Sequence, residues 1–110
     1  MSAVLRDHPP TVSWSGGQFR GGHLPSGHVL RDTVRLAHAD VVGGGPPVPE
    51  RGAPYGSDLR LYAAAGIPTL HLGPGDLRLA HGPAESVPVA EVGHVARTLA
   101  LTALRSCGVA

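Results

Sequence analysis

The chain has 110 residues, the size of one small domain, which excludes a large two-domain enzyme. Its formal net charge is +1, and its nine basic residues are arginines spread singly along the chain, a pattern that argues against nucleic acid as a partner. A single cysteine, Cys107, excludes an internal disulfide, and no apolar run is long enough to cross a bilayer, so we expect a cytoplasmic protein without a membrane partner.

The first expected element is a strand over residues 11–19. Val12 and Trp14 alternate with Ser13 and Ser15, which is the period of a strand with one buried face. We therefore predict a half-buried strand near the N-terminus.

Residues 28–42 change to the period of a helix, because apolar side chains recur there along one face. The side chains of that face are Leu30, Val34, Ala37 and Val41. A run of glycines and prolines over residues 43–47 is expected to end this helix.

The second half of the chain predicts a helix, a buried strand and a final helix. Ser57 or Asp58 can cap a short helix that runs to Ala65. Residues 69–72 are mostly apolar and bounded by proline and glycine, which is typical of a strand buried in a mostly parallel sheet. Residues 89–107 have a helical period again, and their apolar stripe consists of Val92, Val95, Leu99 and Thr102. This order of elements predicts an α/β fold.

His81 is the strongest functional candidate among the residues. It lies in a loop expected over residues 73–88, at the carboxyl end of the predicted strand, where open α/β sheets usually bind ligands. Glycines before it allow the backbone to approach a ligand closely, and Glu85 is placed to orient its imidazole. A solvated loop histidine is the plain alternative.

Several motifs follow one another in the order of a known family. Residues 14–19 read WSGGQF, and residues 55–86 read YGSDLRLYAAAGIPTLHLGPGDLRLAHGPAES. Together they resemble the C-terminal part of the M20 metallopeptidases, the family of acetylornithine deacetylase, succinyl-diaminopimelate desuccinylase, aminoacylase and carboxypeptidase G. The resemblance implies that residues 25–110 form the C-terminal half of a zinc-peptidase-like catalytic domain, a mostly parallel sheet with flanking helices. Residues 1–24 would end a lid or dimerisation domain with one strand.

The resemblance also implies roles for individual residues. His81 corresponds to a metal ligand that the family supplies from its C-terminal half. Arg60 matches the arginine that grips the substrate carboxylate, a task that suits the two-pronged guanidinium. The other implied residues are Gly73 and Gly75 in the substrate pocket, Asp58 beside the arginine, and Glu85 as support of the metal loop. Taken without the resemblance, Arg60 fits a surface arginine, Asp58 a helix cap and Glu85 a solvated carboxylate equally well.

Two other histidines need a separate interpretation. His71 stands in the predicted strand where the family has an apolar residue, so we expect a core or interlayer histidine. His38 and Asp40 mimic an HxDVV metal motif of the family's N-terminal half. Residues two apart on a helix point about 200° apart, so this pair is not expected to converge on a metal.

The implied activity is metal-assisted hydrolysis of the amide bond of N-acyl amino acids or small peptides, with two zinc or cobalt ions and a glutamate base in the complete enzyme. This chain offers one ligand and no catalytic residue, so we expect a partial metal site that is inactive alone. Its partners would be the substrate, a missing N-terminal half and, in the complete enzyme, a second copy. Two alternatives stay open: a non-catalytic binding or assembly module, and an unrelated small α/β domain.

Overall fold

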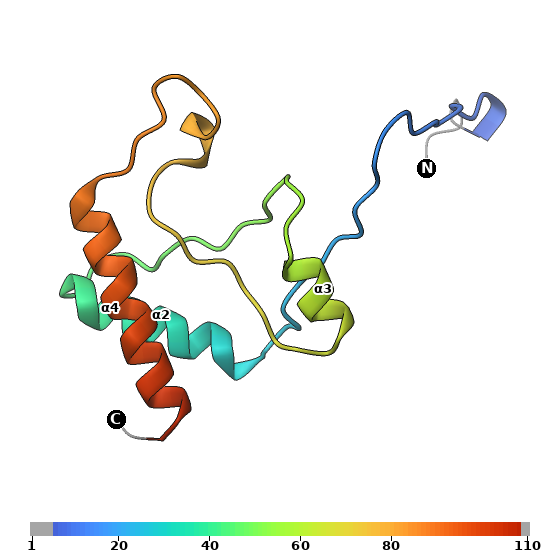
Figure 1. Ribbon diagram of the computed structural model, residues 1–110. Coiled ribbons are helices and arrows are strands. Elements are labelled where there is room, and N and C mark those ends of the chain that lie inside the picture. Colours follow the sequence, from blue (N-terminus) through green and yellow to red (C-terminus); the bar gives the residue numbers. More distant parts are fainter. Residues whose placement is uncertain (1–5, 109–110) are drawn as a thin grey trace.

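A computed structural model of the protein describes residues 6–108. Its helices are α2 (Val29–Val42), α3 (Leu59–Ala64) and α4 (Val89–Ser106), and a short 3-10 helix, η1 (Leu77–Leu79), lies in the loop before α4 (Figure 1). Long irregular segments connect them. The described residues contain no β-strand.

The predicted α/β class, with its mostly parallel sheet and flanking helices, is therefore wrong for this structure. Residues 11–19 and 69–72 were expected as strands, but both are irregular. A strand exists only where a second extended segment accepts and donates its backbone hydrogen bonds. Outside the helices, the backbone hydrogen bonds of the described residues are turns and caps, and none joins either segment to another extended one. Alternating or apolar sequence without a neighbouring strand does not make a sheet.

Helix α2 confirms the prediction for residues 28–42. The Nδ1 atom of His28 accepts a hydrogen bond from the Leu30 N–H at 3.2 Å and so caps the first turn. Gly43 ends the helix with a φ of 77°, a left-handed conformation that glycine adopts without strain. Ala37, which lies on the predicted apolar face, is fully buried.

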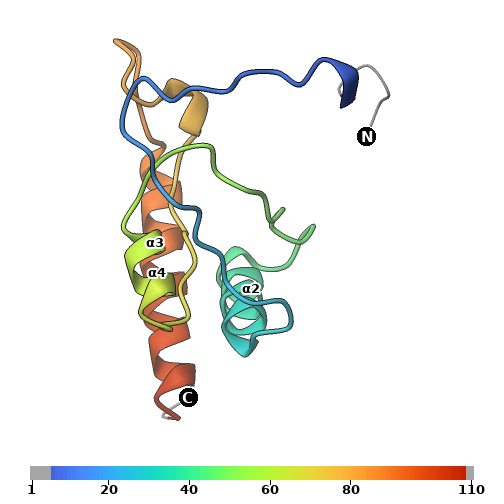
Figure 2. The same cartoon turned by 90° about the vertical axis from the view of Figure 1, so that its right-hand side faces the viewer.

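Helix α4 also lies where it was predicted, and Thr102 of the expected stripe is buried, but the rest of the buried face differs. Thr98 and Thr102 are buried, whereas Val92 and Leu99 are about half exposed, at 48% and 52%. Helix α2 packs against α4, and the fully buried residues of this helix pair are the small Ala37 and Thr98 (Figure 2). The small side chains, rather than the largest apolar ones, define the contact face.

The two threonines of this face differ in their hydrogen bonds. The Thr98 hydroxyl donates to the His94 carbonyl one turn earlier at 2.8 Å. The Thr102 hydroxyl oxygen is buried, and no residue of the described chain forms a hydrogen bond with it. A buried polar group without a partner costs free energy of folding.

The chain is open rather than tightly packed. Its radius of gyration is 18.4 Å, against about 13 Å expected for a compact domain of this length. Its accessible surface is 8722 Å², against about 5,700 Å² for a compact protein of this mass. Leu24 and Ala37 are the buried apolar residues among those described, and apolar side chains such as Trp14 and Val89 remain exposed. The fold therefore leaves many of its large apolar side chains uncovered.

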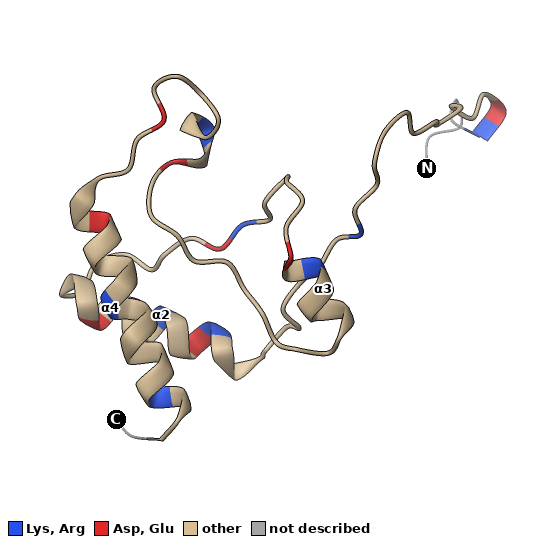
Figure 3. Ribbon diagram, viewed as in Figure 1, with Lys and Arg blue, Asp and Glu red and all other residues tan. Residues whose placement is uncertain are grey.

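Positively charged arginines and negatively charged acidic residues are interspersed over the helices and loops (Figure 3). None of the described helices combines the length and the hydropathy that a membrane crossing requires. The division between residues 24 and 25 into parts of two domains stays a prediction.

Candidate functional site

Helix α3 carries the predicted carboxylate-binding arginine close to its first turn. The Ser57 hydroxyl accepts a hydrogen bond from the Leu59 N–H at 3.3 Å. Asp58 occupies the cap position, but its side chain makes no capping hydrogen bond and it is exposed. Of the two caps that the sequence allowed, Ser57 therefore does the capping. Within residues 6–108, no hydrogen bond or ion pair joins the Asp58 side chain to Arg60.

Arg60 is half-buried because the segment before α2 lies against its helix. Its guanidinium carbon sits 5.0 Å from the centre of the Phe19 ring, a distance at which the cation is attracted to the ring face. A Cβ added at Gly22 would come within 2.9 Å of the Arg60 Cα, so the two backbones touch directly. Within residues 6–108 the Arg60 guanidinium forms no ion pair. It is thus oriented by an aromatic ring while its N–H donors remain available to a carboxylate.

The glycine loop that follows is tied to α4. Gly75 has a φ of 86°, and a Cβ there would lie 3.1 Å from a methyl group of Val87. Its N–H donates to the Glu91 carboxylate at 2.8 Å, in the first turn of α4. Gly73 has open space around its Cα and no such requirement. Glycine is therefore needed at position 75, whereas the structure gives no steric reason for it at position 73.

Asp76 and Arg78 form an exposed pair at the start of η1. The Asp76 carboxylate accepts from the Arg78 backbone N–H at 3.0 Å and from its side-chain Nε at 2.9 Å. The side-chain hydrogen bond to Arg78 lowers the pKa of Asp76 from 3.8 to about 2. This carboxyl group therefore stays ionised at neutral pH and cannot serve there as a proton donor.

His81 has an unusual backbone conformation. Its φ of 62° is the only positive value of a non-glycine residue in the described chain. The Glu85 carboxylate accepts a hydrogen bond from the His81 backbone N–H at 3.0 Å, and the Glu85 N–H donates to the Gly82 carbonyl at 3.1 Å. The glutamate was expected to orient the imidazole, but in the structure it holds the main chain. The imidazole of His81 is left exposed at the surface of the loop.

The described residues do not complete a metal site. Within residues 6–108, no three histidine, cysteine, aspartate or glutamate side chains gather closely enough to hold an ion. Stable protein sites for zinc use three or four such ligands. His81 can contribute one imidazole, and the remaining ligands of such a site would have to come from elsewhere.

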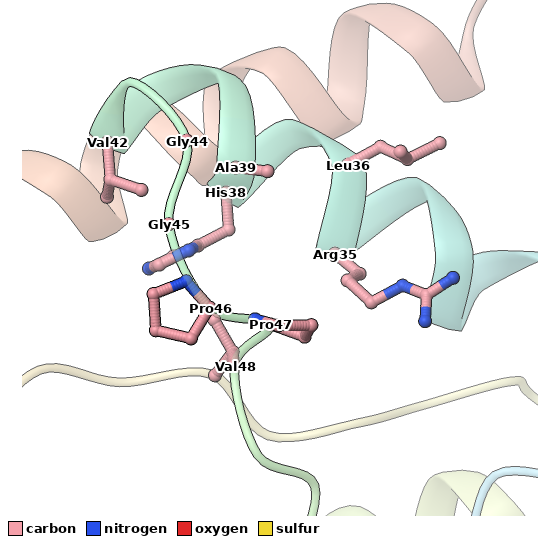
Figure 4. Close-up of a pocket in the computed structure, with 10 residues that line it drawn as sticks. All are labelled: Arg35, Leu36, His38, Ala39, Val42, Gly44, Gly45, Pro46, Pro47 and Val48. Carbon is pink, nitrogen blue, oxygen red and sulfur yellow. The ribbon is translucent and has the colours of Figure 1, made fainter.

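The HxD sequence formed by His38 and Asp40 lies on helix α2, as predicted. Asp40 forms an ion pair with Arg105 of α4. His38 instead faces a shallow pocket of about 210 Å³ between the end of α2 and the loop after it (Figure 4). The pocket is lined by Arg35, Leu36, His38, Ala39, Val42, Gly44, Gly45, Pro46, Pro47 and Val48. The side chains of His38 and Asp40 therefore lie in different surroundings and do not converge.

His71 is exposed, so the expected core position is wrong. Its Nε2 atom lies 2.8 Å from the Ser57 hydroxyl, and its ring centre lies 5.8 Å from that of Tyr55 at an angle of 48°. Sequence reasoning missed this contact, as it missed the roles of Phe19 and Glu91. A polar residue in an otherwise apolar segment was the signal that His71 has a partner.

Comparison with known proteins identifies a family and a relative of this chain. The model of peptidase family M20/M25/M40 matches residues 14–105. The N-formyl-4-amino-5-aminomethyl-2-methylpyrimidine deformylase of Halalkalibacterium halodurans is 33% identical over 103 residues, which cover 86% of this chain and 24% of the relative. The chain thus spans about a quarter of the length of that relative. No solved structure matches the chain significantly.

Proposed function

Because this chain belongs to peptidase family M20/M25/M40, a family of hydrolases, we propose that it forms part of the active site of a metal-dependent amidohydrolase. The bond cleaved is the amide of N-acyl amino acids or small peptides. The observation that carries the proposal is the family match over residues 14–105, which includes Arg60, the glycine loop and His81. Their geometry is compatible with binding rather than with complete catalysis.

Arg60 is proposed to bind the carboxylate of the substrate. The guanidinium presents parallel N–H donors that match the two oxygens of a carboxylate. Phe19 restrains the arginine through its ring, so less side-chain freedom is lost when the substrate binds. Gly73 and Gly75 belong to the proposed substrate pocket, with Gly75 held in place by Glu91.

His81 is proposed to supply one metal ligand, for zinc or cobalt. Its imidazole is exposed, and its backbone is held by the Glu85 carboxylate, which makes Glu85 the proposed support of this loop. M20 proteins are generally metal-dependent, which supports a ligand role for a histidine in this position. Since the described residues supply no further cluster of ligands, the chain on its own is proposed to be inactive.

The remaining part of the site is proposed to lie on another stretch of polypeptide, the N-terminal half of an M20 enzyme. Two observations support this. The chain spans 24% of the related deformylase, and its surface exceeds that of a compact protein by about 3,000 Å². That excess on one chain is at least as large as one partner's share of an obligate interface, which buries about 2,000–5,000 Å² in total over both partners. We propose that the assembled enzyme is cytoplasmic and that it can pair with a second copy.

A second candidate function comes from the relative. Its name describes removal of a formyl group from an aminomethylpyrimidine, a substrate whose name includes no carboxylate. If this chain belongs to such a deformylase, Arg60 has no substrate carboxylate to bind. The two candidates therefore differ in whether catalysis depends on Arg60.

The experiment is to co-express the chain with the N-terminal half of an M20 enzyme and to measure hydrolysis of an N-acetyl amino acid and of the N-formyl aminomethylpyrimidine. We expect activity only when both parts are present, and its loss in His81→Ala but not in His23→Ala, a control at an exposed loop histidine. Arg60→Ala is expected to raise KM for the N-acetyl amino acid about 10- to 150-fold, the effect of losing a charged hydrogen bond.

Different results would point elsewhere. Activity on the pyrimidine that is unaffected by Arg60→Ala supports the deformylase. A stable chain that never activates its partner, on either substrate, contradicts both proposals and favours a non-catalytic binding module.

A further inference from the structure

His71 connects two segments that the proposed site requires. Its Nε2 atom lies 2.8 Å from the Ser57 hydroxyl, and its ring packs at a tilt against Tyr55. Ser57 in turn accepts the Leu59 N–H at the start of α3. His71 therefore contacts the residue that caps the helix of Arg60.

This contact matters because no sheet holds the segment around His71. Within the described chain, the other hydrogen bond of a side chain in residues 69–72 is that of the Thr69 hydroxyl, which reaches the Ile67 carbonyl two residues earlier. The backbone of the segment makes no hydrogen bond to a distant part of residues 6–108. The contact with Ser57 is thus the polar link between this segment, which leads directly into the glycine loop, and α3.

We propose that His71 is a positioning residue for the carboxylate site. Through Ser57 it holds the first turn of α3, and with it Arg60, at a defined place relative to the loop of Gly73 and Gly75. This inference rests on the proposed role of Arg60 in carboxylate binding. His71 itself does not touch the substrate in this proposal.

The hydrogen-bonding capacity of the two groups supports a specific link. A serine hydroxyl can accept and donate at the same time. Ser57 accepts from the Leu59 N–H, and it can at the same time donate its own proton to the Nε2 atom of His71 in the tautomer that carries the ring proton on Nδ1. Loss of either side chain leaves the helix cap and the segment without their connection.

The first test uses the chain alone and NMR of the arginine side chains. We expect His71→Ala to shift the Nε–H resonance of Arg60 and to leave that of Arg97 unchanged, since Arg97 lies on α4 and bonds its own helix at the Gly93 carbonyl. His71→Gln, whose amide can reach the same hydroxyl, is expected to restore most of the native resonance. An Arg60 resonance that is identical in His71→Ala and the native chain overturns the proposal.

The second test uses the co-expressed enzyme and compares KM with kcat for an N-acetyl amino acid. Loss of one hydrogen bond is expected to raise KM about 2- to 12-fold in His71→Ala, with little change in kcat and with recovery in His71→Gln. In an Arg60→Ala background the same substitution should have no further effect, because the positioned group is gone. An equal increase in both backgrounds contradicts the proposal. If Arg60→Ala leaves KM unchanged while the NMR link persists, the proposed carboxylate role of Arg60 fails and the contact between the segments stands.

Discussion

Replacement of Thr102 by valine is expected to stabilise the protein. The Thr102 hydroxyl oxygen is buried in the face of α4 that packs on α2, and it has no hydrogen-bond partner in the described chain. Valine has nearly the same shape and the same β-branch, so the helix and its packing are retained. The substitution therefore removes a polar group that loses its hydration on folding and forms no hydrogen bond within the described chain.

The magnitude follows from the cost of an unsatisfied buried polar group, which is about 1–3 kcal/mol. We take the lower end, about 1 kcal/mol, because Thr102 retains 9% of its exposure. Thr98→Val is the matched control on the same face, since the Thr98 hydroxyl donates to the His94 carbonyl at 2.8 Å. This control should destabilise the protein by about 0.5–1.5 kcal/mol. The two variants thus differ in the sign of their effect.

The assay is thermal unfolding followed by far-ultraviolet circular dichroism. A change of 1 kcal/mol shifts Tm by about 4–8 °C in a domain of this size, which is measurable. We expect Thr102→Val to raise Tm and Thr98→Val to lower it. A Tm that falls equally in both variants would refute the reasoning, because it would show that the Thr102 hydroxyl has a partner after all.

Two further predictions concern the glycine loop. Gly75→Ala should destabilise the protein by about 1–2 kcal/mol in urea unfolding, because its φ of 86° is left-handed and the added Cβ meets Val87 at 3.1 Å. Gly73→Ala, with nothing within 4 Å of the added Cβ, should cost less, and equal losses would contradict the steric argument. The Asp76 carboxyl should titrate with a pKa of about 2 by carboxyl-carbon NMR, and Arg78→Gln should return it towards 3.8. Because the folded pKa is lowered, the stabilising contribution of Asp76 is complete above pH 3.8 and disappears as the pH falls through about 2. Titration of Asp76 near 3.8 in the native chain would disprove its contact with Arg78.

The family and the two longer helices could be predicted from the sequence. The motifs at residues 55–86 indicated the M20 family, and the family match over residues 14–105 confirms it. Helices α2 and α4 begin and end within a residue or two of their predicted limits. These limits depend on neighbours in the chain, such as the left-handed Gly43, so a reader of the sequence can find them.

The strands could not be predicted in the same way. Residues 11–19 and 69–72 have suitable side chains, but a strand also needs a partner that may be far away in the chain. The buried face of α4 was predicted only in part, for a related reason: Thr102 of the expected stripe is buried, but Thr98 was not expected there. Its partner α2 presents the small Ala37, so Thr98 is buried while the larger Leu99 is exposed.

Local sequence thus specified the positions of the helices, the family and the residues worth testing, because helix hydrogen bonds and caps join residues four or fewer positions apart. The tertiary structure decided which of those residues meet. Arg60 faces Phe19, Gly75 bonds to Glu91, and His71 bonds to Ser57, and in each pair at least 14 positions separate the partners. Such contacts depend on the path of the whole chain, since residues that far apart come together only when the segments between them have folded.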